Sequence, residues 1–272
     1  MPTHLITELC ASVPSPRVTA LAGVLALALA LALAASAAEA VEPISVHGST
    51  TFNSRLIEPH RGLIEQRSGQ RLDIIPSKSI HGLMALLEGR ARLAMISSSL
   101  DGEVAHLKAK RPGLPIDRLV GFEIARTRVA FVLHPSNPVR RMSLDQVAAV
   151  LRGGVTGWGE LGGPDLPITV VTVQPGGGVP TTVRGQLLGG KAFTAPRIVE
   201  VEAPRHVVQV TRQLEGAIGL TQLGLARAAP LPELQLEGRI EQELNLVALG
   251  EPAADLRAVI EAARAVAAEH LR

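Results

Sequence analysis

The sequence predicts an α/β protein built in two units. Short β-like runs alternate with helical patterns along the chain, which is typical of a parallel sheet covered by helices. Hydrophobic residues make up 46% of the 272 residues and aromatic residues only 2%, so the core must consist mainly of Leu, Val, Ile and Ala. A new strand pattern begins near Arg128 and marks the start of the second unit.

The first unit reads as three strands separated by two helices. A polar turn at 48–51 leads into a helix that should bend at Pro59 and end at Gly69. A β-α-β-α-β order predicts a parallel sheet with ligands at the carboxyl ends of its strands. The expected strands are 44–47, 72–75 and 93–96, and the second helix is 82–89.

The second unit continues the alternation. A capping box at Ser143–Gln146 begins a helix. The segment 252–271 has one apolar face and predicts a terminal helix with Pro252 at its first position. The expected strands are 129–133, 168–173, 199–201 and 217–220.

Three turns in the first unit offer hydroxyl groups directly after a strand. They are 48–51, 77–82 and 96–99, and the first two lead into a helix. Free backbone N–H groups and the positive end of the helix dipole favour anions at such positions. Ser and Thr are also good helix caps, so an anion site and plain capping both remain possible interpretations.

Residues 1–40 resemble a secretory signal peptide. Arg17 precedes an apolar run at 18–35, and small residues follow up to Ala40. The alternative is a retained membrane anchor. We expect cleavage after Ala40, with Ala37 as the alternative, and hence a periplasmic protein. The remaining chain has no cysteine and a formal net charge of +3, which suits a small anion and gives no case for nucleic acid.

Enzyme and metal motifs are absent from the sequence. It contains no Gly-x-Ser-x-Gly elbow, no His-Glu-x-x-His and no phosphate-binding loop of the Gly-x-x-x-x-Gly-Lys type. The seven histidines after residue 40 show no metal-ligand spacing. No base is spaced to activate Ser49, Ser79 or Ser97, which disfavours a hydrolase. We therefore expect no catalysis, no metal and no cofactor, and we expect Trp158 to lie in the core.

Five segments form a recognisable set in chain order: 48–51, 134–139, 142–147, 155–171 and 216–224. Together they resemble the phosphate-binding proteins of ABC importers. The resemblance implies a type II periplasmic binding protein, in which two α/β lobes hold a ligand in the cleft between them. Lobe 1 would comprise 41–127 and 222–272, and lobe 2 would comprise 128–221. The resemblance also implies a monomer that captures phosphate or a related oxyanion for a membrane permease.

The resemblance assigns ligand-binding positions to both lobes. In lobe 1 they are Ser49, Thr50, Thr51, Ser79 and Ser97. Many family members have an Asp about where Ser97 stands, and that Asp accepts a proton from hydrogenphosphate. Its replacement by Ser weakens the selection for a protonated oxyanion.

Lobe 2 departs further from the family pattern of an Arg, three residues and Ser-Gly-Thr. The aligned residues here are Val173 and then Gly177, Gly178 and Val179, so only backbone N–H groups can face an anion. Each lost charge-assisted contact removes about 1.5–3 kcal/mol, roughly a factor of 10 to 150 in affinity. Lys78, His81 or a distant arginine could replace the charge. The alternative function is a cell-envelope sensor or interaction protein with weak or altered ligand binding.

Overall fold

The computed structural model describes residues 42–111 and 113–271. The expected signal peptide, residues 1–40, lies outside these ranges. Within them, no helix has both the length and the apolar character needed to cross a membrane.

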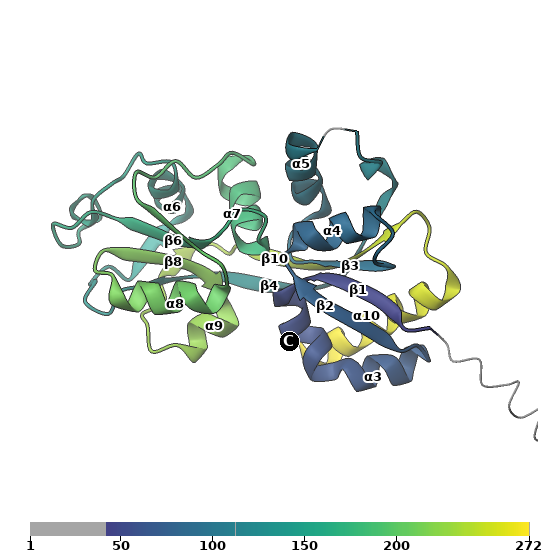
Figure 1. Ribbon diagram of the computed structural model, residues 1–272. Helices are drawn as coiled ribbons and strands as arrows, with labels where there is room; N and C mark the ends of the chain where they lie inside the picture. Colours follow the sequence, from purple (N-terminus) through teal and green to yellow (C-terminus); the bar gives the residue numbers. More distant parts are fainter. Residues whose placement is uncertain (1–41, 112, 272) are drawn as a thin grey trace, which may run out of the picture. The chain divides into compact units, whose positions relative to one another are not determined.

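The chain forms a mixed α/β fold around one eight-stranded sheet (Figure 1). The strand order is β2-β1-β3-β10-β4-β8-β6-β7, and β5 and β9 pair separately. The strands are β1 (Ile44–Ser49), β2 (Leu72–Ser77), β3 (Leu93–Ile96), β4 (Leu119–Leu133), β5 (Arg141–Ser143), β6 (Thr169–Val173), β7 (Ile198–Val201), β8 (Ala217–Gln222), β9 (Gln235–Glu237) and β10 (Glu241–Leu249).

Two groups of parallel strands are joined through antiparallel neighbours. Strands β1, β2 and β3 are parallel, and so are β6, β7 and β8. The 15-residue strand β4 pairs with β10 along 119–128 and with β8 along 129–133. One long strand therefore belongs to both halves of the sheet.

Helices lie on both faces of each strand group (Figure 1). Helices α3 and α10 pack together beside the first group, and α4 packs on β1 and β3. The helices are α2 (Thr50–Phe52), α3 (Glu58–Ser68), α4 (Ser79–Leu87), α5 (Leu100–Lys110), α6 (Leu144–Leu151), α7 (Gly178–Leu188), α8 (Pro204–Gln213), α9 (Leu223–Ala228) and α10 (Ala254–His270). A π-helical turn at Asn53–Ile57 joins α2 to α3, and short 3₁₀ turns lie at Ile116–Arg118 and Trp158–Leu161.

Most local sequence signals act as expected. The capping box at Ser143 and Gln146 starts α6, and Gly69, with φ of +67°, ends α3. The bend expected at Pro59 appears one residue later, as a non-helical φ of −126° at His60. The expectation for Pro252 is wrong: α10 begins at Ala254, with Ala253 as its N-cap residue.

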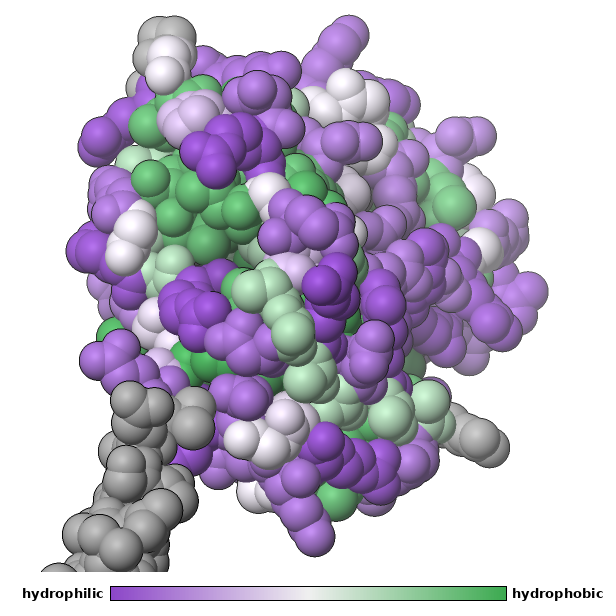
Figure 2. All heavy atoms as spheres, turned by 90° about the vertical axis from the view of Figure 1, so that its right-hand side faces the viewer, coloured by the Kyte–Doolittle hydropathy of each residue, from purple (hydrophilic) through white to green (hydrophobic). Residues whose placement is uncertain are grey.

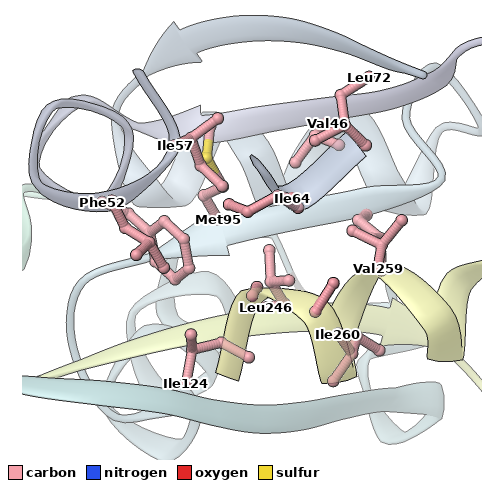
Figure 3. Close-up of a cluster of buried hydrophobic side chains, with 14 of the residues drawn as sticks. Val46, Phe52, Ile57, Ile64, Leu72, Met95, Ile124, Leu246, Val259 and Ile260 are labelled. Carbon is pink, nitrogen blue, oxygen red and sulfur yellow. The ribbon is translucent and has the colours of Figure 1, made fainter. Parts of the chain in front are cut away.

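One large core cluster lies between the first strand group and helices α3 and α10 (Figure 3). Phe52, Ile64 and Leu246 are among its fully buried members. Fully burying one such side chain stabilises the fold by about 1.5–3 kcal/mol. The helix that follows the first hydroxyl turn is thus held to the sheet by its own apolar residues.

A second large cluster contains residues between 129 and 240. It includes Trp158, which is fully buried and donates from Nε1 to the Gly216 carbonyl at 2.8 Å. The structure therefore confirms Trp158 as a core residue.

The lobe boundaries at 127/128 and 221/222 stay a prediction. Residues such as Ala226 and Leu234 pack in clusters with β4 residues of the second unit.

Figure 2 shows one face of the molecule, on which hydrophilic residues predominate and apolar residues gather in patches. Ile75 is a large apolar side chain that is 46% exposed. Singly exposed apolar residues are normal on protein surfaces, so Ile75 alone indicates no function.

Candidate functional site

One small cavity brings together all eight predicted ligand-binding residues. They come from four separate segments of the chain, three in predicted lobe 1 and one in predicted lobe 2. The cavity has a volume of about 30 Å³. Its lining consists of Ser49, Thr50, Thr51, Ser77, Lys78, Ser79, Ser97, Val173, Gln174, Gly177, Gly178, Val179, Glu202, Pro204 and Gln222. Their convergence follows from the parallel strands, whose carboxyl ends meet at one edge.

Ser49 lies at the end of β1 and caps α2. Its Oγ accepts from the Phe52 N–H at 3.1 Å and donates to Ser97 Oγ at 2.8 Å. Ser49 is only 3% exposed. The capping interpretation of this turn is therefore correct, and the same hydroxyl also faces the cavity.

Ser79 and Ser97 connect the other two hydroxyl turns. Ser79 is the first residue of α4, and its Oγ accepts from the Ser97 N–H at 3.2 Å. Both residues are 1% exposed. The third turn also leads into a helix, which the sequence did not reveal, because Ser99 caps α5 by accepting from the Gly102 N–H. The three turns thus form one hydrogen-bonded cluster.

The glycine loop of lobe 2 packs directly against this cluster. Gly177 is the N-cap of α7, and the helix begins at Gly178. A Cβ at Gly178 would lie 2.1 Å from both the carbonyl oxygen and Oγ of Ser97. Gly178 has no positive φ, so close approach to Ser97, and not backbone conformation, requires glycine here.

The site also contacts two glutamines that were not predicted from the sequence. Gln242 on β10 donates from Nε2 to the Ser97 carbonyl at 2.6 Å, and Gln222 at the end of β8 donates to Thr51 Oγ1 at 2.8 Å. Both are buried. No strand was expected at 241–249, although Glu241 and Glu243 alternate with buried residues there. A buried Gln in such a segment gives no sequence signal.

The cavity carries one cationic and one anionic side chain. Lys78 donates from Nζ to Gln174 Oε1 at 2.7 Å, and Glu202 supplies a carboxylate. Val173, which the resemblance aligns with the family's arginine, lines the cavity, and no arginine is among the lining residues. His81, the other expected source of charge, lines a neighbouring cavity together with Lys78.

The lining of the cavity is rich in hydroxyl groups. The hydroxyls of Ser49 and Ser97 are hydrogen-bonded to each other, and no histidine is among the lining residues. Across 42–111 and 113–271, no group of three or more His, Cys, Asp or Glu could hold a metal ion. A cavity needs about 10–15 Å³ to hold one water molecule, so the space suits about two waters. A larger anion requires the surrounding residues to move apart.

A buried carboxylate lies close to this site, where α5 meets α7. Glu103 is fully buried, and Ser98 Oγ donates to its Oε1 at 2.5 Å. Burial raises the pKa of Glu103 to about 7, although the Ser98 hydrogen bond and the positive charge of Arg184 act in the opposite direction. The carboxyl group therefore changes charge near neutral pH.

The sequence is similar to known proteins. Residues 33–265 match the family model described as a PBP superfamily domain. The phosphate-binding protein PstS of Bacillus subtilis is 24% identical over 208 residues, which is 76% of this chain and 66% of that protein, just under two thirds of it.

Solved structures share the fold. A phosphate ABC transporter substrate-binding protein from Clostridium perfringens, with bound phosphate, has a TM-score of 0.66 at 20% identity. An ABC-type phosphate transport receptor from Vibrio cholerae has a TM-score of 0.64 at 18% identity. Each match covers 84% of this chain and 98% of the other. At these identities the likeness establishes the two-lobed α/β fold.

Proposed function

Because the chain belongs to the family described as the PBP superfamily domain, we propose that it is an exported solute-binding protein. It would capture phosphate or a related oxyanion. It would work as a non-catalytic monomer in the periplasm and deliver the anion to an ABC-type permease. The phosphate-binding proteins with the same fold support this assignment.

The observation that carries the proposal is the convergence of three hydroxyl turns on one cavity. Ser49, Ser79 and Ser97 come from turns up to 48 residues apart, yet hydrogen bonds connect them. Hydroxyl and backbone N–H groups are donors for an oxyanion, and the first turn of α4 adds its dipole. In this proposal, lobe 1 provides most of the binding energy and Gly177–Val179 adds backbone N–H groups.

Glu202 gives the proposed site a means of selecting protonated anions. It is the one carboxylate among the cavity's lining residues. A carboxylate can accept an O–H from hydrogenphosphate but repels sulfate, which has no proton at neutral pH. Glu202 would then take the role that the family gives to the Asp replaced by Ser97.

Equilibrium titration of the purified protein tests the proposal. The ligands are phosphate, arsenate, sulfate, molybdate and tungstate at neutral pH. Binding is measured by calorimetry and by the shift in melting temperature. A bound anion at 100 times its dissociation constant should add about 2.7 kcal/mol to the free energy of unfolding. The absence of heat and of any melting shift with all five anions would refute oxyanion capture.

A second function is favoured by the packing of Gly178 on Ser97. That contact, together with the missing arginine, leaves little room and little positive charge for an anion. A cell-envelope sensor or interaction protein with weak or altered ligand binding would need neither that room nor that charge. This second function predicts that the protein does not respond to inorganic oxyanions and that the folded chain binds a partner protein.

A further inference from the structure

A second and much larger cavity lies beside the first. Its volume is about 470 Å³, within the range of about 300–1,000 Å³ that is typical of small-molecule sites. It shares four lining residues with the smaller cavity. The full lining is Thr50, Thr51, Ser54, Arg55, Ala203, Pro204, Arg205, Gln222, Gly224 and Leu225.

The larger cavity is positively charged. Arg55 and Arg205 both line it, and its lining contains no Asp or Glu. Within the described ranges, neither guanidinium forms an ion pair with a carboxylate. Arg205 also lies in the first turn of the ten-residue helix α8, where free N–H groups add positive potential. Two arginines and a helix N-terminus therefore lack a negative partner.

The position of Arg55 depends on a glycine in another element. A Cβ at Gly224, on α9, would lie 2.7 Å from Arg55 Nη1. Gly224 has no positive φ, so its backbone would accept alanine. Its missing side chain leaves space for the guanidinium at the cavity wall.

The remaining lining is partly apolar. Ala203, Pro204 and Leu225 contribute carbon surface, while Ser54 and Thr50 contribute hydroxyls. Arginine binds carboxylate and phosphate groups through two parallel hydrogen bonds. A ligand with an anionic group and an apolar body would match both parts of this lining, whereas inorganic oxyanions would leave the apolar part uncovered.

We propose that this cavity binds a small organic anion, whose carboxylate or phosphate group pairs with Arg55 and Arg205 and whose apolar body contacts Pro204 and Leu225. The site adjoins the hydroxyl-lined cavity and shares four lining residues with it, but its occupation does not require phosphate binding there. Because Thr51 and Gln222 line both cavities and are hydrogen-bonded to each other, a ligand in one would affect the other.

Titration of the full chain with four probes tests the proposal. Benzoate and phenyl phosphate distinguish the two anionic groups, hexanoate tests the need for an aromatic body, and benzyl alcohol is the neutral control. We expect heat from at least one of the three anions and none from benzyl alcohol. Absence of binding by all three anions, or equal binding of benzyl alcohol, would overturn the proposal.

Three variants locate the site. Arg55→Gln and Arg205→Gln should each weaken the binding anion about 10- to 150-fold, the effect of losing a charge-assisted contact. Gly224→Ala keeps both charges but displaces Arg55, so it should weaken the same anion with no loss of melting temperature. The control is Arg152→Gln, because Arg152 is exposed and lines neither cavity. Unchanged affinity in both arginine variants would overturn the proposal.

Phosphate titration of the same variants separates the two sites. Arg55→Gln should leave inorganic phosphate binding within about twofold of wild type, since Arg55 does not line the smaller cavity. If phosphate fails to bind while an organic anion does, the proposed oxyanion function fails and the second site stands. A loss of organic-anion binding in Ser79→Asp alone, with both arginine variants unaffected, would place that ligand in the smaller cavity and overturn this proposal.

Discussion

At the residue scale, Glu103 makes stability depend on pH. Burial raises its pKa from 4.5 to about 7. Between these two pH values the folded state holds a proton that the unfolded state has released. The stabilising contribution is complete below pH 4.5 and is lost as pH rises through 7. By pH 8 the loss should reach roughly 3 kcal/mol.

Replacing Glu103 with Gln should remove this dependence. The variant keeps the shape but cannot ionise, so its free energy of unfolding at pH 8 should exceed that of wild type. Urea unfolding at pH 5 and pH 8 measures the difference. Glu261→Gln, at an exposed position on α10, should keep the wild-type slope. An identical slope in Glu103→Gln would contradict the assignment.

Glu202 governs a second prediction at this scale. Glu202→Gln removes the carboxylate from the smaller cavity, so it should lower phosphate affinity and raise sulfate affinity. The dissociation constant for sulfate divided by that for phosphate should fall about tenfold, which corresponds to about 1.4 kcal/mol. Competition calorimetry at pH 7 gives that ratio. A ratio that stays at the wild-type value would exclude Glu202 from anion selection.

The individual residues of the site differ in how far the sequence predicts them. Ser49, Ser79 and Ser97 are predictable because each lies at or just after the end of a strand, and the ends of parallel strands meet at one edge. Gln242 is not, because its contact with Ser97 spans 145 residues and no local pattern reports a contact over that separation. The binding role of the eight predicted residues stays a prediction, although the structure brings all of them to one cavity.

At the element scale, the contact between the start of α7 and the turn after β3 determines how closely the two parts approach. Gly178→Ala would place a Cβ 2.1 Å from Ser97. Overpacking of this kind typically costs about 1–3 kcal/mol. We expect a lower melting temperature and faster hydrogen exchange in the turn at 96–99.

Helix α7 supplies a matched control for that substitution. A Cβ at Gly185 would meet no atom within 4 Å, so Gly185→Ala should be neutral or should stabilise the protein by about 0.4–1 kcal/mol. Equal melting temperatures for the two variants would show that the Gly178 contact is not tightly packed.

Elements with strong local signals are predictable from the sequence. Strand β3 has the expected bounds, and the capping box locates the start of α6. The first ten residues of β4 carry Glu123, Arg126 and Arg128, so only its apolar end at 129–133 was expected. Tertiary pairing with β10 holds this charged part in the sheet, and no local pattern reports such pairing.

At the scale of the whole molecule, two parallel strand groups share the long strand β4 and the neighbouring β10. The two-lobed fold predicted from the resemblance is confirmed by the sheet order and by the solved relatives. The cavity, at about 30 Å³, is too small for an oxyanion unless the lining segments separate. Binding should therefore change the packing between 97 and 178 as well as the occupancy of the site.

Phosphate and molybdate titration of wild type and Ser79→Asp tests most directly whether the hydroxyl turns bind an oxyanion. Ser136→Asp, at an exposed serine of the second unit, is the control. We predict that wild type and Ser136→Asp bind at least one anion and that Ser79→Asp, folded by circular dichroism, binds none. Equal binding by Ser79→Asp, or no binding by wild type, would contradict an oxyanion site built on the hydroxyl turns.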